Sequence, residues 1–153
     1  LTCIETLPIR MERHFANALK VAEFLDGHSA VSWVSYAGLP ASPYHALARK
    51  YLPRGAGSVF TFGVKGGFDT GVKVVESCNL WSHLANVGDT RSLILHPAST
   101  THRQLTDEQR QAAGAGDEVI RLSVGLETPE DLILDLDRAF SAAARPTIKA
   151  VSS

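Results

Sequence analysis

The sequence predicts an α+β fold, an α/β sandwich in which about four strands form a mixed or mostly antiparallel sheet and helices pack on one face of it. The chain has 153 residues, 44% of them hydrophobic, which suffices for one domain with a core. Short β-rich segments alternate with segments of helical periodicity. The crossover lengths permit a parallel sheet, but the strands are not uniformly apolar, and this favours the mixed or antiparallel arrangement.

The chain opens directly into a helical pattern, without an initiator methionine. Apolar residues recur there at three- and four-residue steps, at Ile4, Leu7, Met11, Phe15, Ala18, Ala22 and Leu25. Pro8 either kinks this helix or marks its start, and Gly27 is a stop signal. Because a native N-terminus rarely begins partway along such a helix, we expect a fragment.

Strands and helices then alternate along the rest of the chain. Alternating β-rich segments predict four strands, over 31–36, 58–64, 92–95 and 119–124. Periodicity and capping residues predict four further helices, over about 43–52, 68–78, 107–113 and 129–140. Thr106 and Gln109 form a capping box before the third of these. The stretch 80–90 has no regular pattern.

Composition excludes several classes of protein. The net charge is -1, so there is no polybasic signal for nucleic acid or anionic lipid. No apolar run approaches the roughly 20 residues of a membrane-spanning helix. Cys3 and Cys78 are too few for a disulfide framework and too far apart for a metal-binding pair. We therefore expect a cytoplasmic protein that binds neither nucleic acid nor membrane.

A loop with two histidines, "HPASTTH", runs from His96 to His102. This spacing fits neither one helical face nor one strand face, and a zinc site usually has closer ligands with a thiolate or carboxylate partner. We therefore predict no metal site and expect these histidines to form hydrogen bonds with the surroundings of the loop. The hydroxyl residues between them lack the G-x-S-x-G pattern of a nucleophilic serine.

A glycine-rich segment, "GVKGG" at 63–67, lies between a predicted strand and a predicted helix. Such a turn could bind a phosphate on helix N-terminal amides. The pattern, however, matches neither G-x-G-x-x-G nor G-x-x-x-x-G-K-[ST]. A tight turn that needs positive φ is the favoured interpretation.

Arg121 occupies the middle of the strand "VIRLSV". An arginine between apolar neighbours must reach water or an anion. A guanidinium there can bind a carboxylate through two parallel hydrogen bonds. The alternative is an arginine on an edge strand that reaches solvent or pairs with an acidic side chain.

Several long segments resemble one enzyme family. The C-terminal "IRLSVGLETPEDLILDLDRAF" resembles the pyridoxal-phosphate enzymes of cysteine and methionine metabolism. "HLANVGDTRSLILHPASTTHRQL", "ETLPIRMERHFANALKVAEFL" and "YAGLPASPYHALARKYLPRGAG" resemble the O-acetylhomoserine sulfhydrylase branch in particular. The likeness runs from about Leu1 to Phe140.

The resemblance implies three substrate-binding residues. Arg121 matches the arginine of "RLSVG", which binds the α-carboxylate of the amino-acid substrate in the family. Asn86 of "ANVGD" takes the place of a serine in the "SLGG"-like segment of the lyases, a departure typical of the sulfhydrylase branch. Thr101 of "TTH" matches a threonine beside the pocket.

The resemblance also implies that the cofactor site lies elsewhere. In the family, pyridoxal phosphate is bound by a lysine that follows a threonine. The lysines of this chain are Lys20, Lys50, Lys65, Lys73 and Lys149, and none of them follows a threonine. No catalytic residue is therefore assigned to this chain, and no cofactor is expected to bind to it alone. Residues 1–27 would be a truncated interdomain helix, 28–144 the small C-terminal domain of a fold-type I enzyme, and 145–153 a frayed tail.

For the full-length enzyme, the resemblance implies γ-replacement, in which acetate leaves and sulfide or a thiol adds, giving homocysteine or methionine. It also implies a large pyridoxal-phosphate-binding domain on the same polypeptide and a homotetramer. Two other hypotheses stay open. One is a stand-alone α+β regulatory module that binds an amino acid. The other is a metal-dependent hydrolase that uses His83, His96 and His102.

Overall fold

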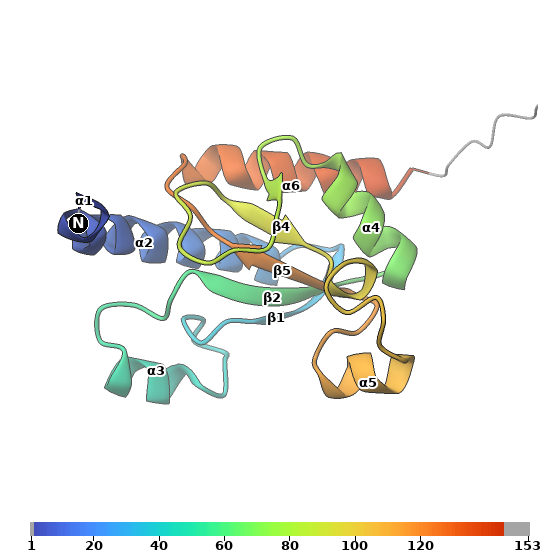
Figure 1. Ribbon diagram of the computed structural model, residues 1–153, viewed down its shortest axis with the longest axis horizontal. Coiled ribbons are helices and arrows are strands. Elements are labelled where there is room, and N and C mark those ends of the chain that lie inside the picture. The colour runs from blue at the N-terminus through green and yellow to red at the C-terminus, as the bar shows by residue number, and fades with distance from the viewer. Residues whose placement is uncertain (1, 146–153) are drawn as a thin grey trace, which may run out of the picture.

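A mixed five-stranded sheet forms the centre of the computed structural model, which describes residues 2–145 (Figure 1). The strands are β1 (Val31–Ser35), β2 (Val59–Val64), β3 (Ser82–His83), β4 (Leu93–Leu95) and β5 (Val119–Ser123). The helices are α1 (Thr2–Glu5), α2 (Leu7–Asp26), α3 (His45–Tyr51), α4 (Gly67–Ser77), the short 3₁₀ helix η1 (Pro97–Ser99), α5 (Asp107–Ala112) and α6 (Pro129–Ala143). The α+β class expected from the sequence is therefore found.

The strand order is β1-β2-β5-β4-β3, which makes β5 the central strand. Neighbouring strands are antiparallel except β3 and β4, which are parallel. The expectation of about four strands was wrong by one, because β3 lies inside the stretch that the sequence left without a pattern. A strand of two residues, Ser82 and His83, is too short to show the alternation that identifies strands.

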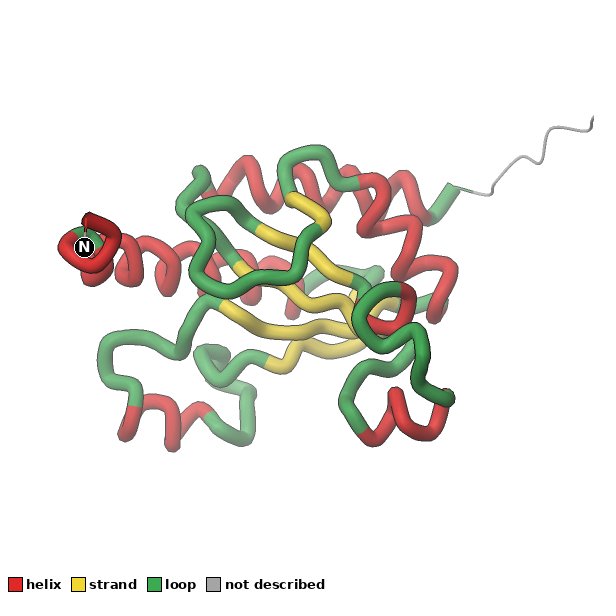
Figure 2. Tube along the Cα trace, in the orientation of Figure 1, coloured by secondary structure: helices red, strands yellow, loops and turns green. Residues whose placement is uncertain are grey.

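Three helices cover one face of the sheet, as expected. The core between them and the sheet includes Phe60 and Phe62 of β2, Ile120 and Leu122 of β5, and Leu132, Leu136 and Phe140 of α6. Full burial of each such side chain contributes about 1.5–3 kcal/mol to the free energy of unfolding. Helices α2, α4 and α6 form this layer, whereas α3 and α5 lie apart from it, below the sheet in Figure 2.

Helix α2 is buried only along its second half. Pro8 lies in its first turn, so this proline marks the start of the helix and does not kink it. Gly27 caps its other end. The expected apolar stripe is not continuous, since Ile4 is 66% and Leu7 41% exposed. The N-terminal half of α2 extends past the edge of the sheet in Figure 1.

Local signals elsewhere are confirmed. Thr106 and Gln109 form the capping box in front of α5, and Pro129 opens α6. The expected tail, 145–153, lies outside the described residues except for Arg145. None of the helices within residues 2–145 combines the length and the apolar character that crossing a bilayer requires.

Candidate substrate-carboxylate site

Arg121 lies in the middle of the central strand β5. Antiparallel pairing places it opposite Thr61 of β2 and Leu95 of β4. Side chains alternate along a strand, and the neighbours Ile120 and Leu122 are fully buried in the core. Arg121 therefore points away from the helical layer, and the alternative of an arginine on an edge strand is excluded.

A small cavity of about 10 Å³, roughly the space of one water molecule, lies over this part of the sheet. Its lining residues come from β4, β5 and the loop between β3 and β4, and they are Leu84, Ala85, Asn86, Leu93, Leu95, Arg121 and Ser123. Arg121 and Asn86 therefore line the same cavity, and Arg121 is the only charged residue among those named. An apolar setting of this kind strengthens a charge-assisted hydrogen bond.

The guanidinium of Arg121 has no acidic partner within residues 2–145. The ion pairs of the described side chains join Lys20 to Glu130, His28 to Asp137, Arg91 to Asp89 and Arg110 to Asp117. Arg121 is half-buried and takes part in none of them. A cation in this position can bind a carboxylate supplied from outside the chain.

Thr101 is not among the residues that line the cavity. It is exposed, and its Oγ1 atom lies 2.8 Å from Nδ1 of the neighbouring His102. Of the three substrate-binding residues predicted from the sequence, Arg121 and Asn86 line the same cavity, and Thr101 does not.

His96 holds the loop that contains Thr101. It is fully buried, and its Nε2 atom donates to the carbonyl oxygen of Asp117 at 2.8 Å. The ring of Phe68 packs edge-on against it. The expectation that the histidines bond to the surroundings of the loop is therefore met at His96, whereas the side chain of His102 bonds to Thr101 within the loop. Across the described part of the chain, no three histidine, cysteine or acidic side chains gather as metal ligands would.

The "GVKGG" segment forms a tight strand-to-helix turn, as the sequence favours. Gly66 and Gly67 have φ values of 109° and 69°, a region that residues with a Cβ rarely adopt. The amine of Lys65 donates to the carbonyl oxygen of Ser29 at 2.8 Å. The glycines of this turn are therefore explained by the positive φ values that it requires, without a bound phosphate.

Neither Cys78 nor Tyr36 is an activated nucleophile. Burial, with a smaller contribution from the charge of Asp135, raises the pKa of the Cys78 thiol to about 12. Burial likewise raises the pKa of Tyr36 to about 12. Both side chains are neutral at physiological pH, so the thiolate that nucleophilic chemistry requires is absent at Cys78.

The sequence did not predict the contacts of Asn17 and Glu127, which fix the segment after β5 and the end of the loop that carries Asn86. Glu127 accepts hydrogen bonds from Ser92, and Asn17 donates to the carbonyl oxygens of Gly125 and Glu127 at 3.0 and 2.8 Å. Glu127 precedes a helix, where acidic residues are common, so the sequence carries no signal of a long-range contact. Asn17 is separated by about 108 residues from the groups it binds.

The fold and the cavity define an α+β domain with a half-buried guanidinium on the face of its central strand that is turned away from the helical layer. A family model described as Cys/Met metabolism PLP-dependent enzyme matches residues 1–141. The chain belongs to this family of pyridoxal-phosphate-dependent enzymes.

Curated relatives agree with this assignment. A homocysteine synthase of Schizosaccharomyces pombe is 49% identical over 140 residues, which are 92% of this chain and 33% of that protein. An O-acetyl-L-homoserine sulfhydrylase of Leptospira meyeri is 50% identical over 137 residues, or 89% of this chain and 31% of that protein. The chain therefore spans about a third of the length of these relatives.

A solved structure shares the fold. It is the crystal structure of a putative O-acetylhomoserine (thiol)-lyase from Campylobacter jejuni, which contains a pyridoxyl-lysine monophosphate. Its TM-score is 0.83 at 43% identity, over 90% of this chain and 32% of that one.

The cavity beside Arg121 does not by itself fit pyridoxal phosphate. Covalent attachment of the cofactor needs a lysine amine, and its ring nitrogen is usually paired with a polar partner. Among the lining residues there is neither a lysine nor an aspartate. The residues present include a guanidinium and a side-chain amide, but no group that would hold the cofactor.

Proposed function

We propose that this chain is the small C-terminal domain of a pyridoxal-phosphate-dependent O-acetylhomoserine sulfhydrylase and that it supplies the site for the α-carboxylate of the substrate. The observation that carries the proposal is the guanidinium of Arg121, which lines a cavity together with Asn86 and lacks an acidic partner among the described residues. The names of the relatives support the choice of reaction.

The proposed reaction replaces acetate on the γ-carbon of O-acetylhomoserine with sulfide or a thiol. The cofactor, held by a large domain of the same polypeptide, supplies an electron sink. We expect the full-length enzyme to be a cytoplasmic homotetramer.

Arg121 binds the substrate by its carboxylate. Two parallel N–H bonds fix the direction in which the amino acid enters, and hydrogen bonds to a charged group each contribute about 1.5–3 kcal/mol. This orientation determines which bond of the α-carbon faces the reactive group. The side-chain amide of Asn86, which in this structure lies beside the carboxylate of Asp89, would turn to bind the carboxylate of the substrate. Thr101 would contribute when the remainder of the enzyme closes the pocket.

The test is the substitution Arg121→Ala in the full-length enzyme. Loss of the guanidinium is expected to raise KM for O-acetylhomoserine by about two orders of magnitude, because about 3 kcal/mol of binding is removed. The absorbance of the bound cofactor should stay the same. Arg138→Ala, which removes an exposed arginine of α6, is the matched control. An unchanged KM for Arg121→Ala would refute the assignment.

A second experiment separates this function from a stand-alone amino-acid-binding module. Isothermal titration of the 153-residue chain with O-acetylhomoserine and with methionine should give no measurable heat of binding, since one half of the pocket is missing. Micromolar binding without cofactor would support the regulatory module in its place.

A further inference from the structure

Asn86 lies on a loop, residues 84–91, that makes little contact with the rest of the domain. Most of its side chains are exposed. The polar contacts of Asn86 stay within the loop: its Oδ1 atom accepts from the N–H of Val87 at 2.8 Å. Asp89 likewise accepts from the backbone N–H of Arg91 at 3.0 Å, and this bond holds the pKa of Asp89 below its usual range. The position of Asn86 is therefore set where the two ends of the loop meet. There the N–H of Ser82 in β3 donates to the carbonyl oxygen of Ser92, the residue before β4, at 2.9 Å.

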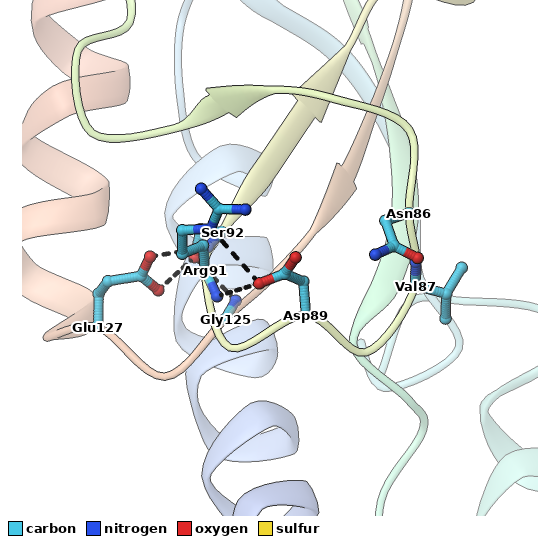
Figure 3. Close-up of polar contacts among 7 residues, drawn as sticks. All are labelled: Asn86, Val87, Asp89, Arg91, Ser92, Gly125 and Glu127. Carbon is cyan, nitrogen blue, oxygen red and sulfur yellow. Dashed lines mark hydrogen bonds and ion pairs between the residues drawn. The ribbon is translucent and has the colours of Figure 1, made fainter.

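Glu127 binds the loop at that junction through both of its carboxylate oxygens. Oε1 accepts from the backbone N–H of Ser92 at 2.7 Å, and Oε2 accepts from the Ser92 hydroxyl at 2.8 Å (Figure 3). The Ser92 hydroxyl in turn accepts from the backbone N–H of Gly125 at 2.8 Å. Ser92 is fully buried and Glu127 partly so, so the bond from Gly125 is shielded from water and the two bonds to Glu127 are partly shielded.

The backbone at Gly125 lies so close to the backbone of Arg91 and Ser92 that no side chain fits at position 125. A Cβ atom on Gly125 would lie 2.5 Å from the backbone nitrogen of Ser92 and 2.5 Å from the carbonyl carbon of Arg91. The N–H of Leu126 also donates to the carbonyl oxygen of Thr90 at 2.8 Å. Residues 125–127, which follow β5, are thus hydrogen-bonded to residues 90–92 at the end of the loop.

The same segment is anchored to the core on its other side. Asn17 of α2 donates to the carbonyl oxygens of Gly125 and Glu127, and it is 1% exposed. Arg121 lies on β5, the strand that leads into this segment, and is held by pairing with two neighbouring strands. Glu127 therefore connects a rigid element that carries Arg121 to an exposed loop that carries Asn86.

We propose that Glu127 is a positioning residue for the amino-acid substrate: through Ser92 it sets the direction in which the loop leaves β4 and so holds Asn86 over Arg121. The inference rests on the proposed function, because it treats Asn86 and Arg121 as the two groups that bind the substrate carboxylate. Without the Glu127 carboxylate, the N–H and hydroxyl of Ser92 lose a charged acceptor. Asn86 then spends less time at the cavity, while Arg121 stays in place.

Steady-state kinetics of the full-length enzyme test this inference. Glu127→Ala is expected to raise KM for O-acetylhomoserine about tenfold, with kcat within about a factor of two. Asn86→Ala should have a similar effect. If Glu127 acts through Asn86, the double variant should be no worse than Asn86→Ala alone. Glu127→Gln should recover part of the loss, because its amide oxygen can still accept the N–H of Ser92.

A matched control separates positioning from a general loss of stability. Glu130→Ala removes a glutamate three residues away that makes only an exposed ion pair with Lys20, and it should leave KM unchanged. Effects of Glu127→Ala and Asn86→Ala that multiply in the double variant would overturn the inference, as would a Glu127→Ala enzyme with normal KM.

Amide hydrogen exchange of the 153-residue chain tests the same contact without relying on the reaction. In Glu127→Ala, the amide of Ser92 and those of the loop should exchange faster, while Ile120 and Leu122 in β5 stay protected. Unchanged exchange at Ser92 would refute the inference. If Glu127→Ala does not fold, Glu127→Gln removes the charge but keeps an acceptor for the N–H of Ser92, and the amide of Ser92 should then exchange faster than in the unaltered chain. A failure of the proposed function would appear differently, as normal KM values for both Arg121→Ala and Asn86→Ala.

Discussion

The Nδ1 atom of His14 lies 2.6 Å from the carbonyl oxygen of Val124 and joins the middle of α2 to the residue that follows β5. Because a carbonyl oxygen can only accept, Nδ1 carries the proton and donates it. His14 is 1% exposed, so water cannot replace this bond. The contact places α2 next to the strand that carries Arg121.

Replacement of His14 by phenylalanine is expected to lower the free energy of unfolding by about 1–3 kcal/mol, because the carbonyl oxygen of Val124 loses its buried donor. Urea denaturation followed by circular dichroism measures the change. His83→Phe is the control, since His83 is exposed and its loss should change stability by less than about 0.5 kcal/mol. Equal effects of the two substitutions would contradict the structural role of His14.

Asp135 stabilises the turn that precedes β3. It is 6% exposed, and its carboxylate accepts from the backbone N–H groups of Asn79, Leu80 and Trp81 at 2.8–3.3 Å. Asp135→Ala leaves these donors without a charged acceptor and is expected to cost about 3 kcal/mol of stability, with Asp135→Asn intermediate. Asp26→Ala, at the exposed end of α2, should be nearly neutral when both are compared by thermal unfolding.

Cys78 should make stability depend on pH in the alkaline range. Its pKa is about 12 in the folded protein, against an ordinary value of 9.0 that applies once the chain unfolds. A raised folded pKa stabilises the protein fully below pH 9, and this contribution is lost as pH rises from about 9 to 12. Urea unfolding at pH 8 and at pH 10.5 should show a decline that is smaller in Cys78→Ala.

The same shift predicts low thiol reactivity. At pH 8, the Cys78 thiol in a Cys3→Ala background should react with a thiol reagent at least about tenfold more slowly than in urea, because the thiolate is the reactive form. Reaction at equal rates in the folded and unfolded protein would show that Cys78 is accessible and ionised.

The 153-residue chain alone is expected to lack activity and to form no stable adduct with pyridoxal phosphate, because the cavity at Arg121 has no lysine in its lining. An absorbance spectrum after addition of the cofactor and removal of the excess tests this. A lasting protein-bound absorbance band that disappears when one lysine is replaced would contradict the expectation.

Local signals in the sequence predicted most element boundaries correctly. Pro8, Gly27, the capping box at Thr106 and the proline at Pro129 act within one helical turn, so their effect is visible in the sequence. Strand β3 was missed because its two residues become a strand only by pairing with β4. The exposed first half of α2 was also missed, since periodicity predicts a face but not what covers it.

The sequence by itself determined that Arg121 turns away from the core, because alternation along a strand is a property of the local backbone and its neighbours are strongly apolar. Only the tertiary structure decided that β5 is central, that Asn86 lines the same cavity as Arg121 and that Thr101 does not. These relationships depend on which strands pair and on contacts such as Glu127 with Ser92, 35 residues apart in the chain. Contacts of that kind are made by side chains that meet only after folding, so no local pattern encodes them.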